Sequence, residues 1–234
     1  MSIRRHPEEY WRGVRDGAPF VLVVCPFALL FGVVATESGL DLTQTMGMSV
    51  LVIAGAAQFA TLQLLAEQAP LVVAVLTGLA VNLRMAMYSA SLTPHLGAAP
   101  LGARALAAYF MVDQVYAMSI QRFVTAELTL GEKLAYYFGV VTPVCPLWYL
   151  CSWVGAVVGG RIPPEFALDF AVPITFIAMV APMLRGIPNL AAAVVAVGVA
   201  LVARSLPYNL GLLVAGGAGM CAGVLAERLR GEDA

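Results

Sequence analysis

The sequence predicts an all-α membrane protein that crosses the bilayer several times, and its composition carries that prediction. Hydrophobic residues make up 61% of the 234-residue chain and charged residues only 12%, whereas a soluble domain has about 25% charged residues. The mean hydropathy is +0.86. The apolar residues also gather in long runs, most of which approach the roughly 20 residues that a helix needs to cross a membrane.

We expect eight transmembrane helices, one for each apolar run. The run that begins at Asn189 is short, and the run that begins at Ala103 contains charged residues. Seven crossings are therefore the alternative, with one of these two weaker runs re-entrant. The eight runs are Ala18 to Ala35, Met46 to Ala66, Leu71 to Leu92, Ala103 to Phe123, Leu134 to Val158, Phe166 to Leu184, Asn189 to Ala203 and Tyr208 to Ala226.

The lysines and arginines predict the orientation, because cytoplasmic loops retain them. Four arginines precede the first run and two follow the last. Eight crossings put both ends of the chain in the cytoplasm and leave only Arg104, Arg161 and Arg204 outside. We therefore expect one transmembrane domain over residues 1–234, with a cytoplasmic segment at 1–17 and a cytoplasmic tail at 227–234.

Several other functions are disfavoured by the composition. The formal charge of −1 gives no electrostatic basis for binding nucleic acid. All four cysteines lie in apolar runs without CxxC spacing, so we expect no metal site, no disulfide and no cofactor. A hydrolase built from Ser89 or Ser91 with His95 is also disfavoured, because neither serine lies in a GxSxG context. We do not expect an enzyme.

Prolines and glycines predict breaks in several of the runs. Pro26 interrupts the first run, Gly55 the second, and Pro143 and Pro146 the fifth. A proline leaves a backbone carbonyl without its helical partner, and inside a membrane that carbonyl must meet protein, water or a substrate. The alternative is that these residues only kink the helices and let them pack closely.

The sequence also contains a possible internal repeat. Val24-Cys25-Pro26 recurs as Val144-Cys145-Pro146, Ile53-Ala54 as Ile177-Ala178, and Arg84 as Arg204. Many transporters are built from such repeats, whose broken helices line a site near the middle of the membrane. Chance similarity between apolar helices is the alternative.

Arg84 is the most informative single residue, because it lies near the middle of the third run. A cation at that depth costs on the order of 3 kcal/mol on insertion scales, so it should face a protein partner or a watery cavity. Tyr88 and Ser91 follow at helical spacing on the same stripe, and Asn82 lies on a neighbouring stripe. This half of the helix is therefore a candidate functional surface.

Asp113 is the expected countercharge of Arg84, because it is the only acidic residue well inside a predicted span. Tyr109 and Tyr116 flank it at the same helical spacing. Two interpretations stay open. The pair could be a permanent ion pair that fixes helix register, or Arg84 could meet a substrate carboxylate while Asp113 carries a coupling proton.

Gln58 is a further candidate in the second run. It follows Gly55-Ala56-Ala57, where small residues can open the backbone. An amide that both donates and accepts suits a zwitterionic ligand at such a place. A hydrogen bond that bridges two helices is the alternative role.

Several motifs in matching order resemble the AzlC family, the large subunits of bacterial branched-chain amino acid exporters. They are Ile53-Ala54-Gly55-Ala56-Ala57-Gln58-Phe59, Val81-Asn82-Leu83-Arg84, Tyr88-Ser89-Ala90-Ser91-Leu92, Met111-Val112-Asp113-Gln114-Val115-Tyr116-Ala117 and Leu168-Asp169-Phe170-Ala171 with Phe176 and Pro182. Two positions depart from the family pattern. Met85 stands where the family usually has histidine, and Gln114 where it usually has glutamate, so two titratable groups are missing.

The resemblance implies a secondary transporter subunit in the bacterial inner membrane, with a cytoplasmic N-terminus. It would export valine, leucine and isoleucine, with methionine as a further candidate, under the proton-motive force. No GxxxxGK[ST] motif for ATP occurs. The resemblance also implies a partner, a small membrane subunit of the AzlD type. A passive small-solute channel, or an exporter of a different small amino acid or related metabolite, is the alternative.

This interpretation assigns roles to the polar residues of the spans. Asn82 and Arg84, with Tyr88 beside them, would bind the substrate carboxylate, and Gly55 and Gln58 would contact the substrate's polar end. Asp113, with Gln114 and Tyr116, would couple transport to the proton gradient or fix helix register.

Overall fold

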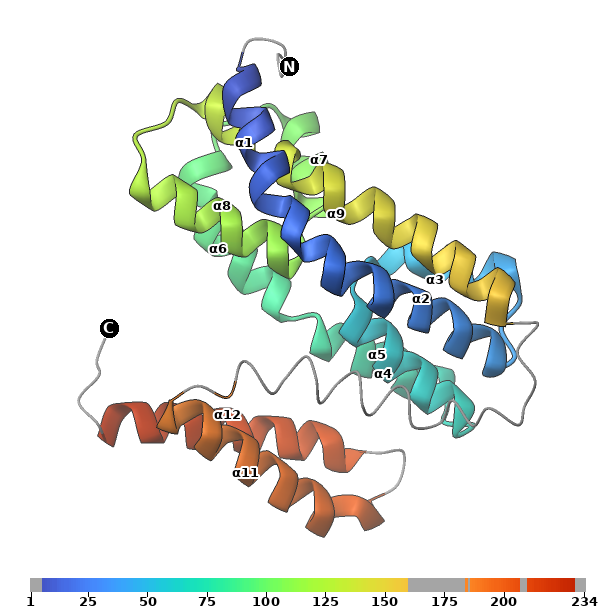
Figure 1. Ribbon diagram of the computed structural model, residues 1–234. Helices are drawn as coiled ribbons and strands as arrows, with labels where there is room; N and C mark the ends of the chain where they lie inside the picture. The colour runs from blue at the N-terminus through green and yellow to red at the C-terminus, as the bar shows by residue number, and fades with distance from the viewer. Residues whose placement is uncertain (1–5, 160–183, 185, 207–209, 230–234) are drawn as a thin grey trace. The chain divides into compact units, whose positions relative to one another are not determined.

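The computed structural model describes residues 6–159, 184, 186–206 and 210–229, and all regular structure in these residues is helical (Figure 1). The predicted all-α fold is thereby confirmed. The chain divides into two compact units, a larger one of residues 1–62 and 78–166 and a smaller one of residues 63–77 and 167–234. The predicted run from Phe166 to Leu184 lies, up to residue 183, outside the described residues.

Four stretches of the described residues are long and apolar enough to cross a membrane. These stretches are Pro7–Glu37, made of α1 (Pro7–Gly17), the 3-10 turn η2 (Ala18–Phe20) and α2 (Val21–Glu37); Leu71–Leu96, made of α5 (Leu71–Val81) and α6 (Arg84–Leu96); α9 (Leu130–Gly159); and α12 (Leu210–Leu229). The shorter helices are α3 (Leu42–Val52), α4 (Gly55–Ala66), α7 (Leu101–Tyr109), α8 (Asp113–Thr125) and α11 (Ile187–Val202), which the 3-10 turn η6 (Ala203–Ser205) follows.

The second predicted run is a helical hairpin and not a single crossing helix. α3 returns along α9, where Trp148 Nε1 donates to Ser49 Oγ at 3.0 Å. It ends at Ile53, which has a left-handed φ of 38°. α4 then runs alongside α2 in the direction of α2, since Gly55 lies against Phe27 and Phe59 packs against Phe31, one turn further along both helices. The prediction of one crossing helix is wrong here, because the backbone reverses at Ile53.

The fourth predicted run is a second hairpin, made of α7 and α8. Tyr109 at the end of α7 reaches the middle of α9, where its hydroxyl lies 2.9 Å from that of Tyr149. Phe123 near the end of α8 instead packs on Tyr136, close to the start of α9. α8 therefore runs back toward the end from which α7 came. One crossing helix is again wrong, and the re-entrant alternative describes this run.

The two hairpins enter the larger unit from opposite ends, and their tips meet inside it (Figure 1). The Tyr109 hydroxyl, at the tip of the α7–α8 hairpin, donates to the Val50 carbonyl oxygen at the tip of the α3–α4 hairpin, at 2.7 Å. Val50 lies in the last turn of α3, whose final carbonyls have no partner within the helix. The Tyr109 hydroxyl thus satisfies one of these carbonyls and joins the hairpins.

α1 and α2 pack along α9 in the same direction, and glycines allow the backbones to touch. A Cβ at Gly32 would clash with the Ser152 carbonyl oxygen, and a Cβ at Gly155 with the Leu29 carbonyl oxygen. Small residues at such positions let membrane helices approach closely. These two long stretches form the scaffold on which the hairpins lie.

Three predicted break positions lie within these scaffold helices. Pro26 is inside α2, and Pro143 and Pro146 are inside α9. The predicted breaks at these prolines are wrong, because the helix continues on both sides of each ring. A proline removes one hydrogen bond and can kink a helix without ending it.

The basic side chains of the larger unit gather at one end. We call the end where α1 and α9 begin, and where α6 and α8 finish, the N-terminal end. All described lysines and arginines of this unit except Arg84 lie there, and the turn between α2 and α3 at the opposite end carries Glu37 and Asp41. The basic residues at the N-terminal end are Arg12, Arg15, Arg104, Arg122 and Lys133.

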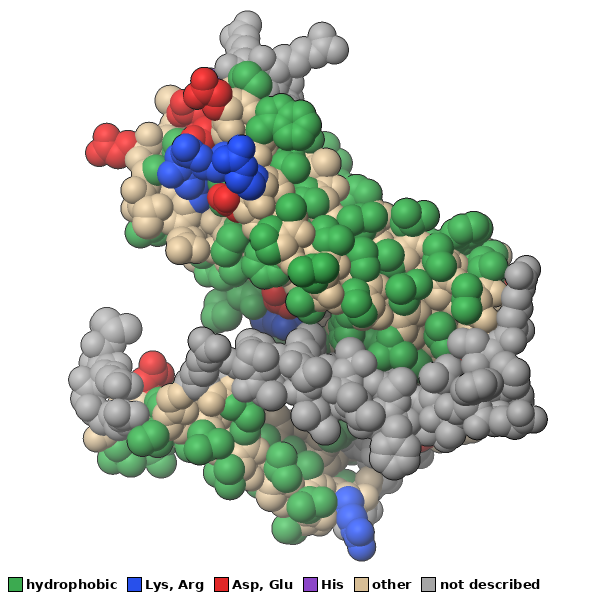
Figure 2. Space-filling model, viewed as in Figure 1, with side chains coloured by type: hydrophobic (Ala, Val, Ile, Leu, Met, Phe, Trp, Pro, Cys, Tyr) green, Lys and Arg blue, Asp and Glu red, His purple; other side chains and the backbone are tan. Residues whose placement is uncertain are grey.

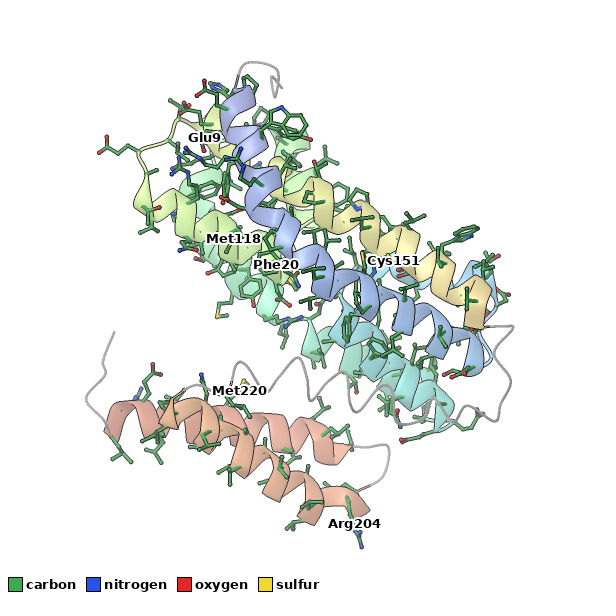
Figure 3. The ribbon with its side chains drawn as sticks, in the orientation of Figure 1. Glu9, Phe20, Met118, Cys151, Arg204 and Met220 are labelled. Atoms are coloured by element: carbon green, nitrogen blue, oxygen red, sulfur yellow. The ribbon has the colours of Figure 1, made fainter. Side chains whose placement is uncertain are left out.

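Ion pairs hold two of these cations close to the start of α1, where charged atoms gather on the visible surface (Figure 2). Glu9, labelled in Figure 3, accepts from Arg122 Nη2 at 2.8 Å and from Arg12 Nη1 at 2.9 Å. Arg104 was expected on the side away from the N-terminus. It lies at the N-terminal end instead, because α7 and α8 form a hairpin.

The smaller unit contains an antiparallel pair, α11 and α12. A Cβ at Gly219 would lie 2.9 Å from the Ala196 Cβ, so small residues again allow close packing. Arg204, labelled in Figure 3, lies in η6 at the end of α11. Ile177, the other member of the possible repeat in this half, lies outside the described residues, and the repeat remains a prediction.

Candidate functional site

Arg84 and Asp113 form an ion pair at the beginnings of two helices. Arg84 is the first residue of α6 and follows a turn at Asn82-Leu83, whereas Asp113 is the first residue of α8 and follows the hairpin tip. Arg84 Nη2 lies 2.9 Å from Asp113 Oδ2, and the two side chains are 35% and 39% exposed. A helix N-terminus favours an acid and disfavours a cation, so Asp113 offsets the unfavourable position of Arg84.

An aromatic stack continues from the ion pair. The rings of Tyr88 and Tyr116 are parallel to within 10°, with their centroids 4.0 Å apart. The Tyr116 hydroxyl then donates to Ser91 Oγ at 3.0 Å. Arg84, Tyr88 and Ser91 therefore face α8 from one stripe of α6, as the spacing predicts. α6 and α8 run in parallel from the ion pair toward the N-terminal end.

Tyr109 does not share a stripe with Asp113 and Tyr116. The break at residues 110–112 separates it from α8, so helical spacing no longer relates the three side chains. Its hydroxyl instead contacts the Val50 carbonyl and the Tyr149 hydroxyl. The predicted grouping is wrong for Tyr109. Nothing in the sequence indicated that this residue joins the hairpin tips.

Four of the predicted site residues carry buried polar atoms without a hydrogen-bond partner among the described residues. These atoms are Nε2 and Oε1 of Gln58, Oδ1 of Asn82, Nε of Arg84 and Oδ1 of Asp113. Gln58 is completely buried. Each unpaired buried polar group costs about 1–3 kcal/mol. The set therefore offers both donors and acceptors to a polar ligand.

Gln58 lies in α4, and Asn82 lies in the turn that follows the neighbouring helix α5, so each is close to a break. Ala57 and Thr61 of α4 face α5, since a Cβ on Gly78 would lie 2.6 Å from Thr61 Oγ1. Asn82 follows Gly78 by one helical turn and so lies on the same side of α5. Gln58 is in the first turn of α4, next to Ala57.

The remaining predicted residues occupy different surroundings. Gly55 is the first residue of α4, and its open side is filled by aromatic rings. A Cβ there would lie 2.5 Å from Phe27 Cε1 and 2.8 Å from Trp148 Cη2. Gln114 is partly buried in the first turn of α8, beside Asp113. At position 55, a residue larger than glycine would have to displace the rings of Phe27 and Trp148.

Two buried hydroxyls were missed by sequence reasoning. Thr45 Oγ1 in α3 and Ser119 Oγ in α8 are fully buried and have no hydrogen-bond partner among the described residues. Isolated hydroxyl residues are common in apolar helices, so neither stood out in the sequence. No cluster of three His, Cys, Asp or Glu side chains suited to a metal occurs among the described residues.

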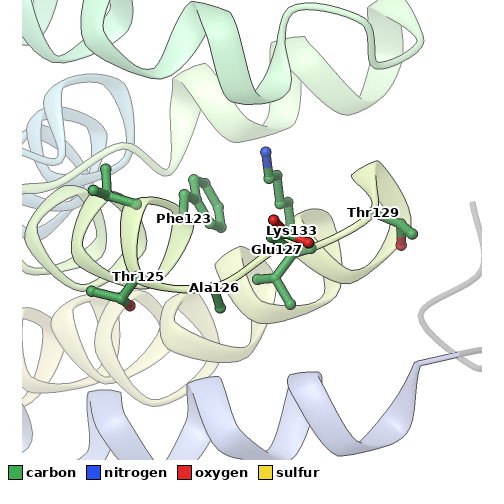
Figure 4. Close-up of a pocket in the computed structure, with 8 residues that line it drawn as sticks. Phe123, Thr125, Ala126, Glu127, Thr129 and Lys133 are labelled. Carbon is green, nitrogen blue, oxygen red and sulfur yellow. The ribbon is translucent and has the colours of Figure 1, made fainter.

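A separate hollow of about 570 Å³ lies at the N-terminal end, where the chain passes from α8 to α9 (Figure 4). Residues 123–129 and Lys133 line it. The Lys133 ammonium lies 3.3 Å from His95 Nδ1 and 5.8 Å from the centre of the Phe123 ring. None of the predicted site residues lines this hollow, so it is distinct from the candidate site.

Comparison with known proteins gives a consistent result. Residues 19–162 match the family described as AzlC protein, and this range contains Gln58, Arg84 and Asp113. The chain is 28% identical over 173 residues to the inner membrane protein YgaZ of Escherichia coli, covering 71% of this chain and 70% of YgaZ.

Two further relatives are membrane proteins. One, from Archaeoglobus fulgidus, is 28% identical over 179 residues, or 75% of this chain and 76% of its own length. The other, from Helicobacter pylori, is 26% identical over 176 residues, or 73% and 75%. No solved structure matches the chain. Because the family match covers more than half of its length, this chain belongs to the AzlC family and is a membrane protein with a role in membrane transport.

Proposed function

We propose that this chain is the large subunit of a two-component secondary exporter of branched-chain amino acids, driven by the proton-motive force. The observation that supports the proposal is a set of buried donors and acceptors that have no hydrogen-bond partner among the described residues and that include atoms of the Arg84–Asp113 pair itself. These atoms lie at helix breaks inside the larger unit. Broken helices that meet near the membrane midplane are typical of substrate sites in secondary transporters.

The chemistry of these atoms suits a zwitterion. Arg84 Nε and Gln58 Nε2 are donors for a carboxylate. Asp113 Oδ1 is an acceptor for an ammonium group, and so is Asn82 Oδ1, which changes the role that the sequence suggested for Asn82 from carboxylate to ammonium binding. Tyr88 stacks beside the ion pair and limits access from the α6–α8 side. An α-amino acid presents both charged groups on adjacent carbons, and its aliphatic side chain would contact the apolar walls.

Asp113 is the proposed coupling residue. Met85 and Gln114 carry no titratable group at the positions nearest the pair. Protonation of Asp113 would remove its attraction for the ammonium group of the substrate, so a proton and the substrate would exclude one another at this residue, as export driven by an inward proton flux requires. Proton binding and substrate binding would thereby be linked at one ion pair.

The orientation and the partner also belong to this proposal. The basic N-terminal end of the larger unit faces the cytoplasm of a bacterial inner membrane, because cytoplasmic segments retain Lys and Arg. A small AzlD-type membrane subunit completes the exporter.

Efflux of labelled valine from cells that express the pair tests the proposal. Arg84→Gln is expected to lower efflux at least tenfold, and an uncoupler is expected to do the same to the unaltered pair. Arg12→Gln is the matched control, because Arg12 is a surface residue paired with Glu9. Valine efflux that ignores both Arg84→Gln and the uncoupler would contradict the proposal and favour a passive channel.

A further inference from the structure

A groove of about 370 Å³ lies between α6 and α7 and ends against Tyr137 of α9. Its walls are mostly apolar, with Leu92 and Leu96 on α6 and Ala105 and Ala108 on α7. Small-molecule sites have volumes of about 300–1,000 Å³ and mostly apolar walls with a few polar groups. The size and lining of the groove therefore suit a small amphiphilic ligand.

The groove extends from the basic end of the larger unit to the tip of the α7–α8 hairpin. Arg104, in the first turn of α7, lines one end, and Met111, in the break, lines the other. The intervening helix makes this distance about 10 Å, at 1.5 Å per residue. Met111 is two residues before Asp113, so the inner end of the groove adjoins the ion pair in the chain.

The polar groups of the groove lie where a charged substrate would need them. Arg104 is exposed, and its one described hydrogen bond runs from Nη1 to the Gly97 carbonyl at 3.4 Å. A guanidinium has five N–H donors, so several stay available for a carboxylate at the mouth. Ser89, further along α6, places a hydroxyl in the groove.

We propose that this groove is the cytoplasmic access path of the exported amino acid. The proposal rests on the proposed export function. Arg104 attracts the substrate carboxylate at the mouth, the leucine and alanine walls receive the aliphatic side chain, and Arg84 takes over the carboxylate beyond the hairpin tip. Ala105 and Ala108 are the residues whose small size keeps the path open.

Filling the groove tests this assignment. Ala108→Leu is expected to lower valine efflux by the expressed pair at least tenfold. Ala117→Leu is the matched control, because Ala117 is an exposed alanine of α8 that does not line the groove. Arg104→Gln is expected to raise the KM for valine severalfold and to leave kcat nearly unchanged.

A labelling experiment gives an independent readout. Ala108→Cys in inverted membrane vesicles is expected to react with a membrane-impermeant maleimide, and valine should slow the reaction. The labelling of the unaltered protein, which has its own cysteines, is subtracted as background. Unchanged efflux in Ala108→Leu overturns the access path. The access path is also overturned if the rate of labelling depends on the lipid composition of the vesicles but not on valine. If the unaltered pair exports no valine, the export function itself fails together with the access path.

Discussion

Gln58 is a buried polar residue whose amide group has no evident role in stabilising the fold. Its side chain is fully buried, yet neither amide atom has a hydrogen-bond partner among the described residues. Packing alone would favour a leucine at this position, since a leucine has a similar size and no polar atom to satisfy. A polar residue that costs stability at a helix break is expected where it serves binding.

Replacing Gln58 separates its effect on the stability of the fold from its effect on export. We expect Gln58→Leu to unfold in detergent at an unchanged or higher temperature, because it removes two unpaired polar atoms that cost about 1–3 kcal/mol each. Valine efflux by the same variant should fall at least tenfold.

A surface glutamine of the same helix provides the control. Gln63 Nε2 donates to Glu67 on the exposed side of α4, so Gln63→Leu should leave export unchanged. A sharp fall in the unfolding temperature of Gln58→Leu, with export retained, would mean instead that the amide bridges two helices.

The energetics of the Arg84–Asp113 pair also indicate a role in binding more than in stability. Both side chains are more than one-third exposed, and an ion pair that water reaches through a cavity would contribute only about 0–1 kcal/mol. Such a small contribution does not account for placing a cation at a helix N-terminus inside an apolar run. The pair was predictable from the sequence, because Asp113 is the single acid deep in the predicted spans.

At the level of helices, the two hairpins were the least predictable feature. An apolar run of about 20 residues has the same composition whether it crosses a membrane or turns back halfway. The first reversal occurs at Ile53, a β-branched residue that rarely adopts a positive φ. The predicted break at Gly55 is confirmed, since α4 begins there, but a break alone does not show that the chain turns back. The second occurs at Phe110-Met111-Val112, which contains neither glycine nor proline. The prolines, in contrast, lie within continuous helices.

The contact between the hairpin tips is open to a direct test. We expect Tyr109→Phe to lower the free energy of unfolding by about 1 kcal/mol, since it removes the hydrogen bond to the Val50 carbonyl. Export should fall as well, because the tips hold the ion pair and Gln58 in place. Thermal unfolding in detergent and valine efflux measure the two effects.

Tyr10→Phe is the matched control for Tyr109→Phe. The Tyr10 hydroxyl also makes one long-range hydrogen bond, to Thr142 Oγ1 at 2.9 Å, but this bond joins α1 to α9 and does not involve the hairpin tips. It should cost similar stability and leave export unchanged. Equal loss of export in both variants would show that the tip contact has no special role.

At the scale of the larger unit, the hairpins change the membrane topology and bring the distribution of lysines and arginines into agreement with the positive-inside rule. With two hairpins, we expect α1–α2, α9 and the α5–α6 stretch, which belongs to this unit from residue 78 onward, to cross the membrane as the described spans of the larger unit. Its described lysines and arginines, apart from Arg84, then share one side, whereas eight crossings would place Arg104 on the other. The positive-inside rule therefore supports the hairpin topology more strongly than it supported eight crossings.

Cysteine labelling in intact cells distinguishes the two topologies. Ala98→Cys, between α6 and α7, is expected to react with a membrane-impermeant maleimide only after permeabilisation, as is Glu127→Cys between α8 and α9. Thr43→Cys at the start of α3 should react in intact cells, because it lies at the opposite end. Eight crossings instead predict that Ala98→Cys reacts in intact cells. That result would return α7 and α8 to a full crossing and would move Arg104, with the groove that it lines, away from the cytoplasm.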